Sequence, residues 1–147
     1  MFLVDTSVWI AVFRRESPLS LGMLVDVDDV VTCLPVVQEV LQGIDAESAF
    51  QTARTALLAM TVVESPLTPA IFDAATQLYR TARRAGITVR SSVDCLIAAC
   101  ALRHGMQVLH ADRDFDALAR VSPLDARNIG KRVALPVRSR RTASQPV

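Results

Sequence analysis

The chain has 147 residues, of which 51% are hydrophobic, which suits one folded domain with a sizeable core and excludes an intrinsically disordered body. Its 16 basic and 15 acidic residues give a net charge of +1, so the charge balance neither indicates nor excludes a nucleic-acid partner. No apolar run approaches a membrane span, no signal peptide opens the chain, and the three cysteines lack a Cys-x-x-Cys pair; we expect a soluble, cytoplasmic protein without a zinc site or a disulfide framework.

Short apolar runs alternate with segments of helical spacing along the chain. The expected strands are 1–4, 30–34, 61–64 and 107–110, with a last edge strand at 132–137. The expected helices are 8–13, 35–43, 45–60, 70–85, 93–104 and 114–119. This alternation predicts an α/β fold in which helices cover both faces of a parallel sheet. Residues 1–137 then form one domain, and the basic segment 138–147 is expected to be a disordered tail.

Four acidic residues stand just after predicted strands or near the start of predicted helices: Asp5, Glu39, Asp94 and Asp112. Ligands of parallel α/β folds bind beyond the carboxyl ends of the strands, which is where Asp5 and Asp112 are expected. Glu39 and Asp94 fall near helix starts, where the helix dipole favours a carboxylate. Because like charges repel, a chain that gathers several carboxylates at one edge usually does so to bind a hard divalent cation.

Each acid also has a simpler interpretation. An aspartate after a strand is often only a helix cap, and an acid in a first helical turn is favoured by the dipole without any ligand. Among Asp112, Asp114 and Asp116, we expect Asp116 to be solvated or capping. The metal hypothesis therefore depends on the acids as an ordered set and not on any single one.

The residues around these acids form an ordered set of short motifs: Val4-Asp5-Thr6-Ser7, Glu39 on a helix after a buried strand, Asp94-Cys95-Leu96-Ile97-Ala98-Ala99 and Asp112-Arg113-Asp114-Phe115. In this order they resemble the PIN-domain nucleases, and most closely the VapC toxins of bacterial VapBC toxin–antitoxin modules. The resemblance extends from about residue 2 to residue 137. It implies a three-layer α/β/α sandwich with a central parallel sheet of four to five strands, and a metal-dependent endoribonuclease.

The resemblance also implies which residues form the site. The catalytic, metal-binding acids of the family match Asp5, Glu39, Asp94 and Asp112, and Asp114 matches an additional acid that can lie close to the metal. Thr6 and Ser7 match hydroxyl positions beside the first acid and are candidates for substrate binding, whereas His110 stands where relatives usually carry Thr or Ser. A VapB-like antitoxin that covers the acidic site and a homodimer are implied in the same way.

Phosphodiester hydrolysis explains why the site would need these residues. Mg²⁺ or Mn²⁺ neutralises phosphate charge and activates a bound water, and Mg²⁺ prefers oxygen ligands. We expect Asp5 and Asp112 to be direct ligands, Asp94 to be shared, and Glu39 to bind a second ion or to orient the attacking water. Basic side chains near the predicted site could hold RNA phosphates, and Arg84 and Arg90 are the candidates.

Two other functions remain open at this stage. A phosphatase that forms an aspartyl phosphate would need an acid two residues after Asp5, where this chain has Ser7, and a lysine at the site, whereas the sole lysine is Lys131. A catalytically silent PIN-like module that binds RNA or protein could retain all four acids. Metal-dependent RNA cleavage separates the nuclease from the silent module.

Overall fold

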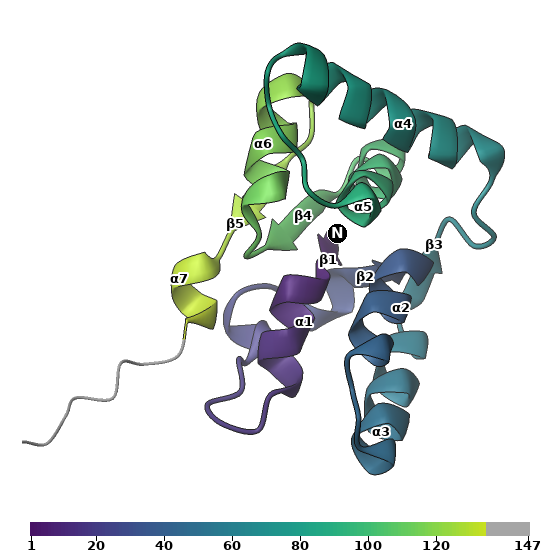
Figure 1. The fold of residues 1–147 in the computed structure, drawn as a ribbon. Coiled ribbons are helices and arrows are strands. Elements are labelled where there is room, and N and C mark those ends of the chain that lie inside the picture. Colours follow the sequence, from purple (N-terminus) through teal and green to yellow (C-terminus); the bar gives the residue numbers. More distant parts are fainter. Residues whose placement is uncertain (135–147) are drawn as a thin grey trace, which may run out of the picture.

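The computed structural model describes residues 1–134 and contains a parallel sheet of five strands (Figure 1). The strands are β1 (Phe2–Val4), β2 (Val30–Cys33), β3 (Thr61–Val63), β4 (Gln107–His110) and β5 (Ala126–Asn128), in the spatial order β3-β2-β1-β4-β5. Every neighbouring pair is parallel, so the carboxyl ends of all the strands lie at one edge of the sheet.

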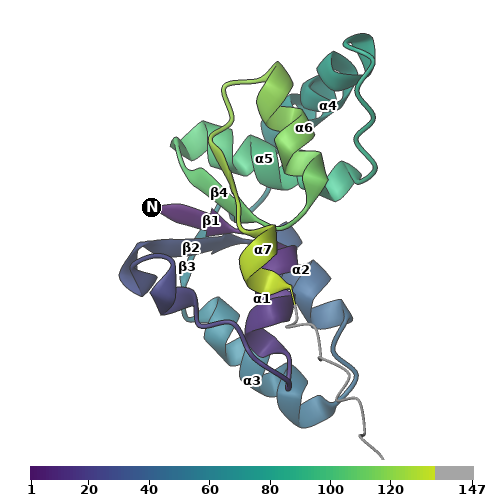
Figure 2. The ribbon, with the colours of Figure 1, turned by 90° about the vertical axis from the view of Figure 1, so that its left-hand side faces the viewer.

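Helices cover both faces of this sheet. They are α1 (Thr6–Phe13), α2 (Leu34–Gln42), α3 (Glu47–Leu58), α4 (Pro69–Arg84), α5 (Ser92–His104), α6 (Arg113–Val121) and the short α7 (Gly130–Val133). Helices α1, α2 and α3 lie on one face, and α4, α5 and α6 lie on the other (Figures 1 and 2). The expected α/β/α sandwich with a parallel central sheet is therefore confirmed.

The short strands are apolar because helices bury them on both faces. Leu3 and Val4 of β1 and Val108 and Leu109 of β4 are fully buried, which explains why these strands read as continuous apolar runs. The three cysteines are buried in the core and form no disulfide. Among residues 1–134, no helix is long and apolar enough to cross a membrane.

Polar side chains begin the helices that follow the carboxyl edge. Asp5, Ser91 and Asp112 are the N-caps of α1, α5 and α6, and each side chain accepts a hydrogen bond from a backbone N–H two or three residues further on. The three caps satisfy backbone N–H groups in the first turns of these helices.

The prediction of a last edge strand at 132–137 is wrong for the part of it that is described. The edge strand is β5, at Ala126–Asn128, and residues 130–133 form α7 instead. Ile129 continues the pairing, since its N–H donates to the carbonyl of His110 at 2.7 Å. An exposed edge strand with the sequence Ala-Arg-Asn has no apolar run, so the pattern favoured the more apolar segment that follows. Positions 135–137 and the expected tail at 138–147 lie outside the described residues.

Candidate metal centre

The parallel sheet brings the acids of distant segments to its carboxyl edge. Asp5 directly follows β1, and Asp112 follows the adjacent strand β4, whose Leu109 carbonyl accepts the N–H of Asp5 at 2.9 Å. Glu39 lies in α2, the helix that leaves β2 on the other side of β1. Asp94 lies in the first turn of α5, from the opposite helical layer.

Carboxylate oxygens of these residues form two groups that share one member. Ligand oxygens of Asp5, Glu39 and Asp94, here called the first acidic triad, all lie within 4.8 Å of one another. The same holds for Asp94, Asp112 and Asp114, the second acidic triad. All four acids predicted from the sequence, and the additional Asp114, therefore belong to two adjacent groups joined by Asp94.

The first acidic triad has buried oxygen atoms that lack a hydrogen-bond partner. Asp5 and Asp94 are 3% and 5% exposed, and Asp5 Oδ1 and Asp94 Oδ2 accept no hydrogen bond. Buried polar atoms are rarely left unpaired, and two such oxygens among like charges are costly. A hard cation bound by these oxygens would satisfy both atoms and offset the repulsion, so the residues fit a divalent metal ion.

The same crowding shifts the acidity of two carboxyl groups. Burial, followed by the nearby charge of Asp5, raises the pKa of Asp94 from 3.8 to about 8. Burial likewise raises the pKa of Asp5, although hydrogen bonds from Ser7 oppose the change. Without a cation, the site therefore favours retention of a proton near neutral pH, and a bound divalent ion would favour its release.

Hydroxyl groups of α1 hold two of the carboxylates. Thr6 donates from Oγ1 to Oε1 of Glu39 at 3.1 Å, and Ser7 donates from both N and Oγ to Oδ2 of Asp5. Ser7 Oγ also accepts the N–H of Ala111, at 2.9 Å, and so links α1 to the segment after β4. Both hydroxyls therefore orient the acids, and the contact with substrate expected from the sequence stays a prediction.

Replacing Ser7 with Ala is expected to weaken metal binding by about tenfold, because loss of groups that orient ligands typically costs ten- to a hundredfold in affinity. The change also leaves the Ala111 N–H unpaired, which should lower the free energy of unfolding by roughly 1–3 kcal/mol. Mn²⁺ titration and urea unfolding measure the two effects. Ser92→Ala, at an exposed serine in α5, is the control, and unchanged Mn²⁺ affinity in Ser7→Ala would contradict the positioning role.

The second acidic triad is tied to the loop before α5. Asp114 is 3% exposed, and its Oδ2 accepts the backbone N–H groups of Arg90 and Ser91 at 2.9 and 3.2 Å. The Arg90 side chain lies 3.6 Å from Asp114 and 4.0 Å from Asp112. Of the two predicted arginines, Arg90 thus lies at the acids, whereas Arg84 is exposed in the last turn of α4.

His110 and Asp116, which are close in sequence to the acids, make contacts outside both acidic triads. His110 is fully buried against Phe115, with ring centroids 5.2 Å apart, and burial lowers the pKa of its imidazole. Asp116 is exposed and accepts a hydrogen bond from Asn128 at 2.7 Å. The complete burial of His110 fits a structural role, and Asp116 belongs to neither triad.

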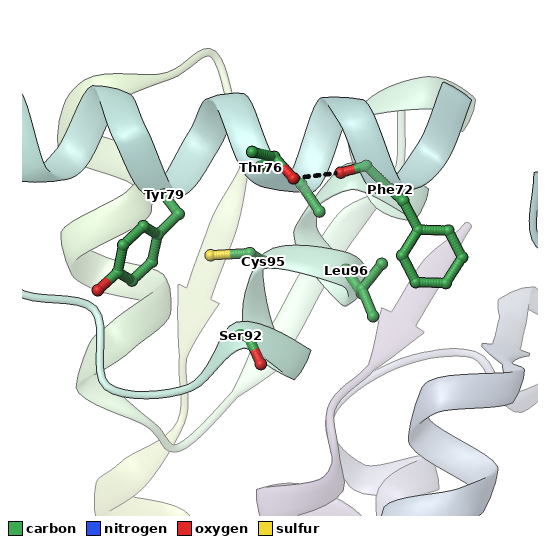
Figure 3. A pocket seen from close by; sticks show the side chains of 7 residues that line it. Phe72, Thr76, Tyr79, Ser92, Cys95 and Leu96 are labelled. Atoms are coloured by element: carbon green, nitrogen blue, oxygen red, sulfur yellow. Dashed lines mark hydrogen bonds between the residues drawn. The ribbon is translucent and has the colours of Figure 1, made fainter. Parts of the chain in front are cut away.

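An apolar groove near the site was not anticipated from the sequence. Side chains of α4 and α5 line this groove, which has a volume of about 350 Å³; Phe72, Tyr79, Ser92 and Leu96 are among them (Figure 3). Phe72 and Tyr79 remain 49% and 41% exposed there. The available signal was their spacing of seven residues, which places two large apolar side chains on one face of α4 outside its core-facing stripe.

Comparisons with known proteins agree with this architecture. The family model described as the PIN domain matches residues 2–121. The chain is 37% identical over 132 residues to VapC ribonuclease Mb1587 of Mycobacterium bovis and to Ribonuclease VapC11 of Mycobacterium tuberculosis, with 86% of this chain and 97% of each relative covered.

Solved structures show the same fold at lower sequence identity. VapBC-5 from Mycobacterium tuberculosis has a TM-score of 0.65 and 20% identity, and covers 86% of this chain and 97% of its own. A toxin–antitoxin complex from Klebsiella pneumoniae has a TM-score of 0.63 and 22% identity, with 85% and 99% covered. Since the family model and the sequence relatives each match most of the chain, this protein belongs to the PIN-domain family and, within it, to the VapC ribonucleases.

Proposed function

We propose that this chain is the toxin of a toxin–antitoxin pair and acts as an endoribonuclease that depends on Mg²⁺ or Mn²⁺. The observation that carries the proposal is the pair of buried oxygens, Asp5 Oδ1 and Asp94 Oδ2, which have no partner within a cluster of carboxylates. The sequence relatives are ribonucleases by name, which supports RNA as the substrate.

The catalytic residues of the proposal are Asp5, Glu39, Asp94 and Asp112. A bound divalent ion supplies charge neutralisation at the phosphate and a water of lowered pKa. Asp5 and Asp94 offer the free oxygens that would hold the ion. Glu39, oriented by Thr6, would hold the ion or accept a hydrogen bond from the attacking water, and Asp112 would complete the acidic edge.

The substrate would approach from the side of Arg90. The Arg90 side chain is 56% exposed although it lies beside two acids, so much of it remains accessible to solvent. A guanidinium in this position suits a phosphate of the RNA backbone, which would otherwise be repelled by the carboxylates. Arg84 is a more distant candidate for the same backbone, at the end of α4.

The proposed partners are a VapB-like antitoxin and a second copy of this chain. Two of the solved neighbours are VapBC-5, of a toxin–antitoxin family, and a toxin–antitoxin complex, which supports the antitoxin. The exposed apolar side chains of Phe72 and Tyr79 support contact with protein at α4. Light scattering from the antitoxin-free chain tests the homodimer, for which the expected mass is twice the 16.0 kDa of one chain.

Cleavage of total cellular RNA by the purified, antitoxin-free chain is the experiment that tests the function. We expect discrete fragments with Mg²⁺ or Mn²⁺, none with EDTA, and none from Asp5→Asn. The substitution removes a charged ligand of the proposed ion, whereas Asn can still cap α1, so the fold should be retained. Asp116→Asn, at an exposed acid outside both triads, is the matched control and should cleave normally.

The outcome also separates the alternative functions. A folded protein that binds metal but cleaves no RNA would support the silent PIN-like module instead. The phosphatase alternative is less favoured for two reasons. The position two residues after Asp5 carries Ser7, a hydroxyl hydrogen-bonded to Asp5, where a phosphatase would need an acid. The sole lysine of the chain, Lys131, lines a groove with residues of β5 and α7, where a phosphatase would need a lysine at the site.

A further inference from the structure

The two acidic triads differ in their surroundings: Asp5, which belongs only to the first, keeps a buried oxygen without a hydrogen-bond partner, whereas a cation lies beside the second. Asp5 and Asp94 each retain a buried oxygen without a partner. In the second acidic triad, Oδ1 of Asp112 accepts the N–H of Asp114 at 2.9 Å. Oδ2 of Asp114 accepts two further backbone N–H groups, those of Arg90 and Ser91, which hold this carboxylate against the loop before α5.

A cation of the chain itself lies at the second acidic triad. Arg90 Nε is 3.6 Å from Asp114 Oδ1, and Arg90 Nη2 is 4.0 Å from Asp112 Oδ1. The backbone of the same residue is fixed, because its N–H donates to Asp114 Oδ2 at 2.9 Å. The backbone contact thus holds Arg90 next to Asp114, and its guanidinium lies beside both carboxylates.

A guanidinium remains charged at every pH at which the protein is folded. A divalent ion bound by Asp112 and Asp114 would lie within a few ångströms of this charge, and the two cations would repel each other. We propose that Arg90 takes the place of a second metal ion at Asp112 and Asp114, so that the site binds one divalent cation, at Asp5, Glu39 and Asp94.

This inference rests on the proposed metal-dependent function and gives the number of ions and their place. One metal ion and one guanidinium would share the charge neutralisation that two ions provide in two-metal nucleases. Because Arg90 is 56% exposed, the fixed positive charge also faces solvent, where a phosphate would arrive.

The test is a direct count of Mn²⁺ bound by the full chain, freed of antitoxin and metal, at pH 8, by equilibrium dialysis or by the electron paramagnetic resonance signal of free Mn²⁺. The wild type should bind one ion. Arg90→Gln should gain a second ion, with second-site affinity at least about tenfold above that of the wild type. Arg90→Lys, which keeps the charge, should bind one.

Two further variants locate the ions. Arg84→Gln removes an exposed arginine at the end of α4 and should still bind one ion. Adding Asp112→Asn to Arg90→Gln should remove the second ion, which places it at the second acidic triad. Circular dichroism of each variant checks that the fold is retained.

Two ions in the wild type, or one ion in folded Arg90→Gln, would overturn the inference while leaving metal-dependent cleavage intact. A second ion that persists in the double variant would also overturn it, because that ion would lie elsewhere. No bound Mn²⁺ in the wild type would overturn the proposed metal-dependent function itself, and the inference with it.

Discussion

Replacement of Asp94 with Asn is expected to abolish metal-dependent RNA cleavage and yet to stabilise the metal-free protein at pH 8. Asp94 belongs to both acidic triads, so its loss removes a ligand from each. Metal ions contribute several kcal/mol of transition-state stabilisation, which corresponds to a fall in rate of about three orders of magnitude or more. Stability should change in the opposite direction, because the substitution removes a buried charge surrounded by other acids.

The gain in stability should depend on pH with a definite sign. An unfolded chain loses the Asp94 proton near its ordinary pKa of 3.8, whereas burial raises the pKa in the folded state to about 8. Between these values the folded state binds more protons than the unfolded state, so the free energy of unfolding of the wild type falls as pH rises. Asn does not titrate, so the difference between variant and wild type should widen from pH 5 to pH 8.

Urea unfolding in EDTA at several pH values measures this difference, and RNA cleavage with Mn²⁺ measures the loss of activity. Asp116→Asn is the control, since Asp116 is an exposed acid on the first turn of α6 and lies outside the triads. An Asp94→Asn protein that is no more stable than the wild type at pH 8 would show that the carboxylate is not strained by its neighbours.

Addition of Mn²⁺ to the metal-free wild type should raise its melting temperature, and more strongly at pH 8 than at pH 6. A ligand that binds only the folded state stabilises it by about 2.7 kcal/mol at a hundred times its dissociation constant. For a domain of this size, that energy corresponds to a rise of roughly 5–10 °C. The effect should weaken in acid because the ion must displace a proton from the Asp5 and Asp94 carboxyl groups, whose pKa values burial raises.

Scanning calorimetry with and without Mn²⁺ measures this shift. Asp5→Asn and Asp94→Asn should lose most of it, whereas Asp116→Asn should keep it. Equal shifts in all of these variants would mean that Mn²⁺ binds elsewhere on the protein, and an equal shift at pH 6 and pH 8 would argue against displacement of a proton.

The strands and the order of the acids could be predicted from local patterns. Residues such as Leu3 and Val108 lie in runs that are apolar on both faces, because helices cover the sheet on both sides. Parallel pairing then forces the residues after β1 and β4 to the same edge, so the convergence of Asp5 and Asp112 follows from their positions in the chain. The edge strand β5 was misplaced because an exposed edge needs no apolar run.

The contacts within the site could not be derived in this way, because they depend on side-chain direction and on loops that join different layers. Thr6 and Ser7 follow Asp5 in the sequence, yet their contacts differ. Thr6 donates a hydrogen bond to Glu39, whereas Ser7 forms hydrogen bonds with Asp5 and with the segment after β4. Arg90 is twenty-four residues from Asp114, and it reaches that acid only because the loop before α5 packs against the start of α6. A pattern of residue types specifies which chemistry is available, whereas the distances between oxygens and the placement of a neutralising cation arise from packing, in which each loop and helix end is set by its neighbours.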